Sequence, residues 1–559
     1  MKRALPAAWL AAGALLLFWN LGRPALWQDE AETALRAESI LETGLPRTTL
    51  DGVLVTTQDE LAAHEGTRAG VWTWDTWLPA SLAAASMALL GRTPLAARLP
   101  FALAGLLALG LSWRLFLAGE NDAAPSARRI WAPEAGLALL ALSPAFVLFC
   151  RQSRYYALLA LGTPLVLLAW RRLLAGRRGG VLAVALSLQV LLHASFAFFA
   201  TAGLALALDA ALRGRECVGQ RRFWQAAGLA LALALPAILY FRVWSRPGNH
   251  LYGFRESLEF LKTFELWLAA FALPSALAAA ADWRRWERVL LGFALLCGLV
   301  SEGTLSILCG VAVLGWILLS AARERPARGV MSLRRMSLLW IAAALGPLAF
   351  GAAEPYGRYL AGLLPVCAYL AARWVSAAGR GRARACAALT AAAVSCNLLF
   401  VLPLKAAQFL AAPRAPADSV SGMMRARLRA LPPRSGLALL AGELWRGPRG
   451  YVEPVAAAMR AGGGKTFFAD GDELSLMFAT GLRPVYPDEL AGASPDWLLP
   501  SPWLRLRPEA LARLRALAAS GRYEAAPLSA PRLLWQNNPD PLFHDFRPET
   551  GPRVLLRRR

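Results

Sequence analysis

Long apolar runs, separated by short polar tracts, fill most of the first four hundred positions of this 559-residue chain. About 20 mainly apolar residues cross a bilayer as a helix, and fewer suffice where arginine side chains reach the interface. With 57% hydrophobic and 17% charged residues and a mean hydropathy of +0.42, the chain is too apolar for a soluble enzyme of this length. The pattern predicts an α-helical polytopic membrane protein with about 13 transmembrane helices, near 5–22, 98–118, 134–150, 157–174, 181–194, 197–212, 224–241, 265–281, 288–301, 304–322, 337–352, 359–375 and 386–404.

Basic residues outnumber acidic ones by 60 to 37, which gives a formal net charge of +23. They are scattered between the apolar runs, as in Arg171-Arg172, Arg177-Arg178, Arg284-Arg285 and Arg334-Arg335, and do not form one patch. This distribution is typical of membrane topology and of contact with anionic lipid, and it argues against nucleic acid as a partner.

The sequence predicts neither a disulfide framework nor a cleaved signal peptide. The seven cysteines lie in or between apolar runs, with none after Cys396 and no paired metal-ligand spacing, so neither a disulfide framework nor a zinc site is encoded. The run 4–22 is long, and no small-residue cleavage site follows it before Trp27, so we expect an uncleaved first span.

The basic tracts also predict the sidedness of the spans. The run 77–91 is short and follows a cluster of tryptophans, so we interpret it as an interfacial helix. The tracts from Lys2-Arg3 to 373–384 then fall on one side, which the positive-inside rule makes cytoplasmic. We expect a multi-pass protein of the cell inner membrane, with a cytoplasmic N-terminus and with the loop 23–97 on the extracytoplasmic face.

The composition changes after residue 404, where proline, arginine and glycine rise and the apolar runs shorten. We therefore expect a transmembrane domain at 1–404 and a small soluble periplasmic or extracytoplasmic α/β domain at 405–559. The glycines at 462–464 before Lys465 do not form a phosphate-binding loop, because the earlier glycine is missing and helix precedes strand. Strands are predicted at 437–440, 466–469, 497–499 and 554–556, and helices at 455–461 and 508–520.

Acidic residues follow the first span in the sequence Leu26-Trp27-Gln28-Asp29-Glu30-Ala31-Glu32. A carboxylate near the headgroup plane can act as general base toward a hydroxyl, or can hold a divalent cation against a lipid phosphate. Asp29 and Glu30 are therefore candidate catalytic residues, and Glu30 is also a candidate metal ligand. The alternative is a solvated helix start, where acids are favoured in the first turn.

Positive charge on the outside runs against the topology rule and marks two further clusters. Arg151, Arg154 and Tyr155 form the first, and Arg358 and Tyr359 form the second. Guanidinium forks and phenol hydroxyls suit a phosphate or pyrophosphate leaving group, so these five residues are candidate substrate ligands. Interfacial arginines within an aromatic belt would give the same pattern, and both interpretations stay open here.

Two other outside positions carry candidate roles. His193 lies at a predicted hairpin, where neutral imidazole can complete a metal site or orient a sugar hydroxyl, or can be a hydrogen-bonded turn residue. Trp74, with its neighbours Trp72, Asp75 and Trp77, can form a shelf on which a sugar stacks, or can anchor the interfacial helix.

Taken together, these segments resemble the polyprenyl-phosphate-sugar-dependent membrane glycosyltransferases of the C-type fold, the superfamily of the protein O-mannosyltransferases and the lipid A aminoarabinose transferase. Leu26 to Ala31 is similar to the family's acidic motif. Leu90-Gly91-Arg92 through Ala97-Arg98-Leu99-Pro100 resembles its glycine-to-Arg-Leu-Pro stretch, and Arg358-Tyr359 before Leu363-Leu364-Pro365 resembles its late arginine-tyrosine-to-proline pattern. The resemblance covers residues 1 to about 404.

The resemblance implies a transferase that moves a sugar, with inversion, from a polyprenyl-phosphate donor to an envelope lipid, glycan or protein. Asp29 would be the general base or orient the acceptor, Glu30 would assist it or bind metal, and the lipid phosphate would contact Arg154 and Arg358. The segment 73–77 occupies the place of a more polar segment in the family, which leaves the acceptor and the need for a divalent metal ion open.

The main alternative is a polytopic transporter or a flippase for lipid-linked sugars. Such proteins place ionisable residues near the membrane midplane, in discontinuous spans. Here the charged residues cluster at one set of span ends, and the proline-interrupted spans at Pro164 and Pro236 carry no buried charge beside the proline. The sequence therefore favours the glycosyltransferase.

Overall fold

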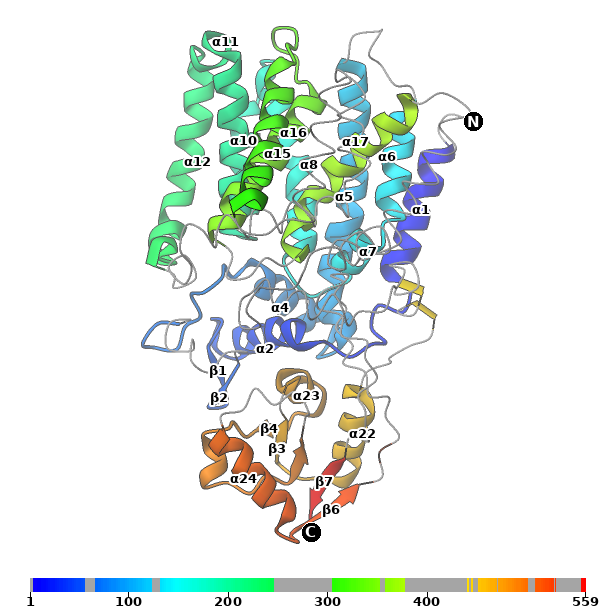
Figure 1. The fold of residues 1–559 in the computed structure, drawn as a ribbon, viewed down its shortest axis with the longest axis vertical. Helices are drawn as coiled ribbons and strands as arrows, with labels where there is room; N and C mark the ends of the chain where they lie inside the picture. Colours follow the sequence, from blue (N-terminus) through cyan, green and yellow to red (C-terminus); the bar gives the residue numbers. More distant parts are fainter. Residues whose placement is uncertain are drawn as a thin grey trace.

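The computed structural model of the chain shows a bundle of helices standing on a smaller α/β unit (Figure 1). It describes residues 4–55, 66–122, 131–245, 304–351, 357–377, 440–441, 444–445, 451–469, 471–500, 508–526, 528 and 554–559.

Apolar helices form the bundle, because a helix satisfies its own backbone hydrogen bonds where no water can do so. Within the described ranges, the helices long and apolar enough to cross a membrane are α5 (Pro94–Asp122), α8 (Tyr156–Leu174), α10 (Phe196–Arg213) and α12 (Arg221–Tyr240). Around them pack α1 (Ala4–Phe18), α9 (Gly180–Leu192), α15 (Thr304–Arg323), α16 (Leu333–Gly351) and α17 (Leu364–Ala377). The protein is thus a multi-pass membrane protein.

Each apolar run predicted within the described ranges coincides with a helix or with a pair of helices. The last of these, 359–375, begins with a 3-10 helix, η4 (Gly357–Leu363), that leads into α17. The predicted spans 265–281, 288–301 and 386–404 lie outside the described residues.

One apolar run is divided into two helices. The helix α6 (Ala132–Ala141) and the short helix α7 (Pro144–Cys150) meet at an angle of 56°. Pro144 begins α7, and the hydroxyl of Ser143 accepts a hydrogen bond from the Phe146 backbone N–H at 3.3 Å, which caps the helix. The bend directs the turn 151–155 toward the loop that follows α1.

Ion pairs join the helices at the bundle end that lies uppermost in Figure 1. Asp209, on α10, accepts a hydrogen bond from Arg213 Nε at 2.8 Å and lies 3.0 Å from Nε of Arg335 on α16. Asp122, at the end of α5, receives two hydrogen bonds from Arg171 of α8, at 2.6 and 2.9 Å. Basic tracts that the sequence placed in separate loops therefore lie together at this end.

Two helices lie across the opposite end of the bundle (Figure 1), namely α2 (Gln28–Thr43) and α4 (Leu78–Leu90). They pack against each other, and α4 also packs against α5. The ribbon of β1 (Thr49–Leu50) and β2 (Val53–Leu54) lies beside α2. The helix expected at 77–91 is α4, and its Leu89 side chain is 84% exposed, as suits a helix at a membrane surface.

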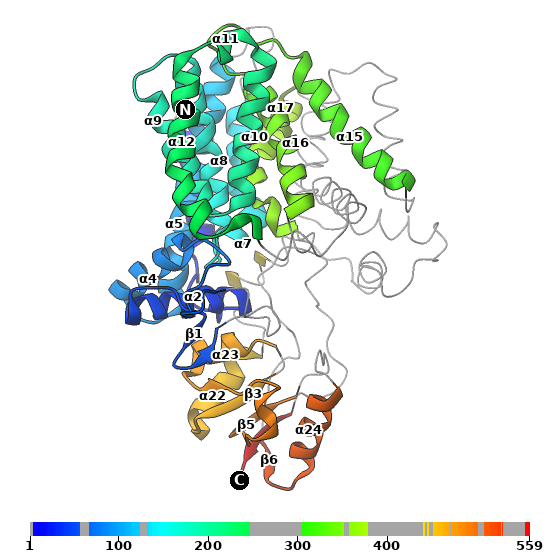
Figure 2. The ribbon, with the colours of Figure 1, turned by 90° about the vertical axis from the view of Figure 1, so that its left-hand side faces the viewer.

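The C-terminal unit is a five-stranded sheet with helices on its faces (Figure 2). Its strand order is β4-β3-β5-β7-β6, in which β3 runs parallel to β4 and β5 while β7 runs antiparallel to β5 and β6. The strands are β3 (Thr466–Ala469), β4 (Arg483–Pro484), β5 (Trp497–Leu499), β6 (Tyr523–Ala526) and β7 (Leu555–Arg558), and the helices are α22 (Val452–Gly462), α23 (Glu473–Thr480) and α24 (Pro508–Ala519).

The structure confirms most of the secondary structure predicted for the tail. Strands at 466–469 and 497–499 have the predicted bounds, β7 overlaps the predicted 554–556, and α22 and α24 cover the predicted helices. At 437–440 only residue 440 is described, and it is helical, so the expected strand is not seen there. The boundary expected at 404/405 lies outside the described residues.

Asp496, directly before β5, connects this strand to the start of β3. Its carboxylate accepts hydrogen bonds from the backbone N–H groups of Lys465 and Thr466, at 2.7 and 3.1 Å, and pairs with Arg558 at 2.8 Å. Partial burial works to raise the pKa of Asp496, but these hydrogen bonds and the charge of Arg558 outweigh it, so the pKa is lowered.

A lowered pKa in the folded state predicts that the sheet loses stability in acid. The contribution of Asp496 is present above its unfolded pKa, about 3.9, and is lost as the pH falls through the lower folded value. Hydrogen-exchange protection of the β3 amides, corrected for the intrinsic rate, should fall below about pH 4 and should lose this dependence in Asp496→Asn. Protection in the wild type that stays constant in acid would contradict this account.

Candidate functional site

The start of α2 carries three carboxylates. Successive side chains on a helix point about 100° apart, so Glu30 faces away from Asp29 and Glu32, which lie three positions apart on one side of the helix. The Trp27 backbone N–H donates to Glu30 Oε2 at 3.3 Å, which begins the helix, and the acids favour its positive N-terminal end.

Glu30 is fully buried and is held by Arg98 of α5, which is 1% exposed. Arg98 Nε donates to Glu30 Oε1 at 2.7 Å, and Arg98 Nη2 donates to Glu30 Oε2 at 2.6 Å. The Ser153 backbone N–H also donates to Oε1, at 2.8 Å. This bidentate pair with a third donor satisfies both oxygens of Glu30.

Arg98 in turn fixes the chain between α1 and α2. It donates to the carbonyl oxygens of Leu21, Pro24 and Ala25 at 3.1, 2.7 and 2.8 Å. Together, Glu30 and Arg98 join α2, α5, the 151–155 turn and the segment that leads to α2. Their joint burial therefore sets where the first turn of α2 lies.

Asp29 contacts arginines from two other parts of the chain. Its Oδ2 lies 3.2 Å from Nη1 of Arg358, on η4, and 3.8 Å from Nη2 of Arg154, in the turn after α7. Burial opposes the charge of Arg154, but the carboxylates of Asp29 and Glu32 outweigh it, and the pKa of Arg154 is raised above its ordinary value. A carboxylate beside two permanent cations is thus built into the start of α2.

Glu32 connects Arg154 to a third arginine. Its Oε2 accepts from Arg154 Nη1 at 3.1 Å, and its Oε1 accepts from Nη2 of Arg36, one turn along the same helix. The Arg36 guanidinium lies over the ring of Trp72, with 3.1 Å between Cζ and the ring centroid. Glu32 thereby orients the guanidinium groups of Arg36 and Arg154.

Arg151 serves the fold at the end of α1. Its Nη1 donates to the carbonyl oxygens of Leu16, Leu17 and Trp19 at 2.9, 3.0 and 2.8 Å, and the side chain is almost fully buried. The last carbonyls of a helix have no partner within it, and a cation also complements the helix dipole there. Arg151 thus lies three positions before Arg154, but it binds the end of α1 and not Asp29.

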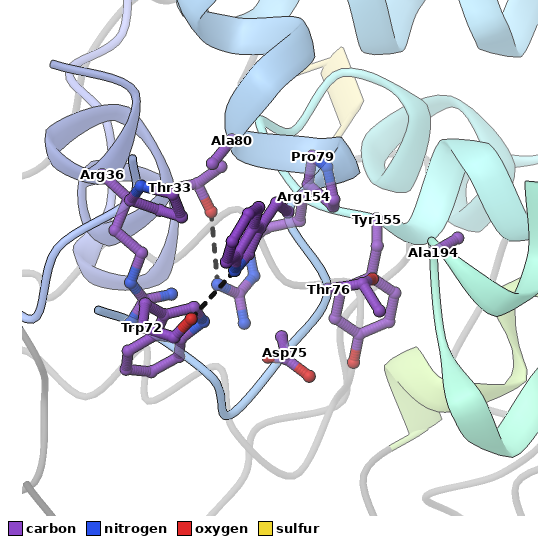
Figure 3. A pocket seen from close by; sticks show the side chains of 12 residues that line it. Thr33, Arg36, Trp72, Asp75, Thr76, Pro79, Ala80, Arg154, Tyr155 and Ala194 are labelled. Carbon is purple, nitrogen blue, oxygen red and sulfur yellow. Dashed lines mark hydrogen bonds between the residues drawn. The ribbon is translucent and has the colours of Figure 1, made fainter. Parts of the chain in front are cut away.

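A small pocket opens beside these arginines (Figure 3). Arg36, Arg154 and Thr33 line it from one side, and Asp75 and Tyr155 face it as well. Its wall is completed by Pro46, Trp72, Thr76, Trp77, Pro79, Ala80 and Ala194. Aromatic rings with a few charged groups are typical of a site for a small polar ligand such as a sugar.

The tryptophan segment before α4 forms part of this pocket in a way that differs in detail from the sequence-based expectation. Trp72 and Trp77 line the pocket, whereas Trp74 is half-buried and is not among its lining residues. Trp77 donates from its ring N–H to the Trp72 carbonyl at 2.8 Å and packs edge-on against Tyr240, with centroids 5.5 Å apart. The segment is thereby fixed to the end of α12.

Aromatic side chains surround the two arginines that contact Asp29. The Arg358 guanidinium lies 5.7 Å from the Trp27 ring centroid and 5.8 Å from that of Tyr359. Arg154 lies 5.6 Å from the ring of Tyr155. Burial, followed by neighbouring tyrosines, raises the pKa of Tyr155 well above its ordinary value, so its hydroxyl stays a neutral donor.

The structure does not bring His193 and Glu30 together as metal ligands. His193 ends α9, and its carbonyl accepts a hydrogen bond from the Thr76 hydroxyl. In the described ranges, no group of three or more His, Cys, Asp or Glu side chains is placed to hold a metal ion. With Arg98 and Ser153 on its oxygens, Glu30 does not fit as a metal ligand in this arrangement.

Comparisons with known proteins place the fold. No family model matches the chain, and no curated protein sequence matches it significantly. Among solved structures, ArnT from Cupriavidus metallidurans bound to undecaprenyl phosphate is 13% identical with a TM-score of 0.50, and the alignment covers 99% of this chain and 97% of that one. The same protein in the apo state is 14% identical with a TM-score of 0.48 and the same coverage. An oligosaccharyltransferase from Archaeoglobus fulgidus, in complex with Zn and sulfate, is 13% identical with a TM-score of 0.40 over 86% of this chain and 62% of that one.

At such low identity, the likeness to ArnT concerns the fold alone. It extends over nearly the whole of both chains, so it includes the bundle, the helices across its end and the C-terminal unit. The C-type glycosyltransferase fold expected from the sequence motifs is thus confirmed.

Three groups that contact Glu30 or Arg154 were given no role from the sequence. Arg98 was visible only as part of the Arg-Leu-Pro stretch, although a charged residue within an apolar run is a signal in itself. Glu32 is the last residue of the acidic motif, and nothing in the sequence indicated a function for it. The Ser153 backbone N–H leaves no trace in a sequence, because every residue except proline has one.

Neutralising Glu30 should destabilise the protein sharply. In Glu30→Gln the buried Arg98 loses its countercharge, which typically costs about 3–5 kcal/mol. Thermal unfolding of the protein in detergent should show a clear fall in Tm, while Glu42→Gln, on the exposed end of the same helix, should match the wild type. A Glu30→Gln protein as stable as the wild type would contradict the structural role of the pair.

Proposed function

We propose that this protein is an integral membrane glycosyltransferase. It moves a sugar from a polyprenyl-phosphate donor to a hydroxyl of an envelope lipid, glycan or protein, on the extracytoplasmic face and with inversion. The observation that carries the proposal is the position of Asp29, whose carboxylate lies between Arg154 and Arg358 beside an aromatic, polar pocket.

Arg358 and Arg154 would bind the lipid phosphate. Guanidinium groups hold phosphate oxygens through paired, charge-assisted hydrogen bonds and stay charged at every physiological pH. Arg358 comes from η4, directly before α17, so a phosphate bound to it would lie at the membrane boundary, with its polyprenyl chain among the helices. Tyr359 and Trp27 provide aromatic surface next to the same guanidinium.

An exchange of partners would couple donor binding to the activation of the base. Arg358 lies 3.2 Å from Asp29 Oδ2, and a phosphate that takes this guanidinium releases that oxygen. The released carboxylate can then accept the proton of an acceptor hydroxyl. Arg154 is also held by Glu32, at 3.1 Å.

The reaction can then proceed by a single displacement. The acceptor hydroxyl gives its proton to Asp29 while its oxygen forms a bond to the anomeric carbon. The bond from that carbon to the phosphate oxygen breaks, and the phosphate leaves with the electron pair. Arg358 and Arg154 stabilise the charge that develops on the phosphate, and attack from the opposite side inverts the anomeric centre.

The neighbouring candidates receive other roles. Glu30 positions Asp29 through its buried pair with Arg98, and Arg151 holds α1. The pocket residues Trp72, Trp77 and Tyr155, in place of Trp74, would accommodate the sugar or the sugar-like part of the acceptor.

Two further features are consistent with this proposal. The fold is that of ArnT, which was solved bound to undecaprenyl phosphate. The bundle end that holds the Asp209 and Asp122 ion pairs carries the basic tracts, and we assign it to the cytoplasm by the positive-inside rule. The site at α2 and the C-terminal unit, taken as the domain 405–559, then face the outside of the cell inner membrane.

Removing the proposed base should abolish transfer with little effect on the fold. In Asp29→Asn the side chain keeps its size but cannot take up a proton, and the rate should fall by about a hundredfold or more. The measurement is transfer from a panel of radiolabelled polyprenyl-phosphate sugars to an envelope lipid extract by the purified protein. Glu42→Gln, on the same helix, is the matched control.

The same assay separates this function from its alternative. Cleavage of the sugar–phosphate bond by the wild type, lost in Asp29→Asn, supports the transferase. Full activity in Asp29→Asn would move the base to another residue. Binding or translocation of the lipid-linked sugar without bond cleavage would favour a flippase instead.

Arg358→Ala should weaken both the binding and the reaction of the donor. A lost charge-assisted contact to phosphate is worth roughly 2–4 kcal/mol at the transition state, and part of this is already lost in the bound ground state. Binding of undecaprenyl phosphate alone, measured in detergent micelles, should weaken at least tenfold, or about 1.4 kcal/mol. Arg68→Ala, an exposed arginine of the loop 23–97, should leave this binding unchanged.

A further inference from the structure

The C-terminal unit contacts the segment that leads into α2, and then α2 itself. Asn20 Nδ2 donates to the Leu444 carbonyl at 2.7 Å, and the Ala25 backbone N–H donates to Glu453 Oε1 at 2.7 Å. Residues more than four hundred positions apart are thus joined immediately before the site. Figures 1 and 2 both show α23 next to α2 on the side away from the bundle.

The contact nearest the site is made by Gln28, the residue before Asp29. Its Nε2 donates to Glu473 Oε1, and its Oε1 accepts from the Leu474 backbone N–H at 3.1 Å. Both ends of the carboxamide are used, and both partners belong to the first turn of α23. An N–H in the first turn of a helix has no partner within that helix, so Gln28 fills an available position.

A second contact ties α2 to α23 further along. Arg92, after α4, pairs with Glu38 of α2 and donates from Nη1 to the Phe478 carbonyl of α23 at 2.6 Å. Its guanidinium also lies 4.5 Å from the Phe478 ring centroid. The helix α2 is therefore held against α23 near both of its ends.

We propose that Gln28 and Glu473 are positioning residues for the reaction, through which the C-terminal unit holds the first turn of α2 so that Asp29 meets Arg154 and Arg358. This inference rests on the proposed role of Asp29. From the bundle side Glu30 fixes the same turn, and from the opposite side Gln28 fixes it, so Asp29 lies between two anchors.

The chemistry of the contact distinguishes positioning from simple packing. Two domains that merely adhere can do so through apolar surface, which tolerates small shifts. A carboxamide that uses its donor and its acceptor on one helix end permits a single orientation. Because a displacement of about 1 Å at a reacting group can cost a hundredfold in rate, loss of this contact should affect catalysis more than donor binding.

The test compares three full-length variants at positions that begin helices of the C-terminal unit. Glu473→Leu removes the acceptor for Gln28, Glu473→Gln retains an acceptor oxygen, and Glu509→Leu changes an exposed glutamate in the first turn of α24. We expect kcat for sugar transfer to fall about tenfold or more in Glu473→Leu, with KM for the donor within about twofold of the wild type. Glu473→Gln and Glu509→Leu should stay near the wild type.

Hydrogen exchange gives a second readout that does not depend on activity. Amides in the first turns of α2 should lose protection in Glu473→Leu and in Gln28→Ala, but not in Glu473→Gln, and the double variant should add little to either single change. Unchanged protection of α2 and unchanged kcat in Glu473→Leu would overturn the proposal. If the wild type transfers no sugar, the proposed function fails, whereas the exchange experiment still decides whether Glu473 holds α2.

Discussion

The buried pair of Glu30 and Arg98 is the interaction on which the site depends. Two charges removed from water are tolerated only when each is fully hydrogen-bonded, and here Arg98 serves two carboxylate oxygens and three carbonyls while Ser153 adds a further donor. The pair adds little net stability compared with an apolar contact, but it allows only one arrangement of α2 against the bundle. It therefore specifies geometry at the place where geometry matters most.

Three carboxylates within four positions of the sequence have separate tasks, although Asp29 and Glu32 share Arg154 as a partner. Glu30 points into the bundle and is structural, Asp29 meets arginines from two distant segments, and Glu32 holds the arginines of the pocket side. The carboxylate that we propose as the base is thus placed next to two carboxylates that hold arginines in fixed positions.

The sequence predicted the fold well because apolar length and basic tracts are local signals, and the same holds for the tail strands at 466–469 and 497–499. It also selected Asp29, Arg154 and Arg358, which the structure brings together from three parts of the chain. It could not distinguish the role of Arg151 from that of Arg154. Arg151 caps α1 and Arg154 faces Asp29 because of the bend between α6 and α7, which comes before both residues. Nor could it anticipate Gln28 with Glu473, a pairing that depends on how two distant units meet.

The bend between α6 and α7 has a consequence for how this chain can vary. The turn that follows it holds α1 through Arg151, Glu30 through the Ser153 amide and Asp29 through Arg154, within four consecutive residues. Inserting or deleting a single residue there would shift all three contacts at once, and no compensating change elsewhere could restore them together. The length of this turn is therefore fixed far more tightly than its composition, although loops are normally the parts of a protein that vary most.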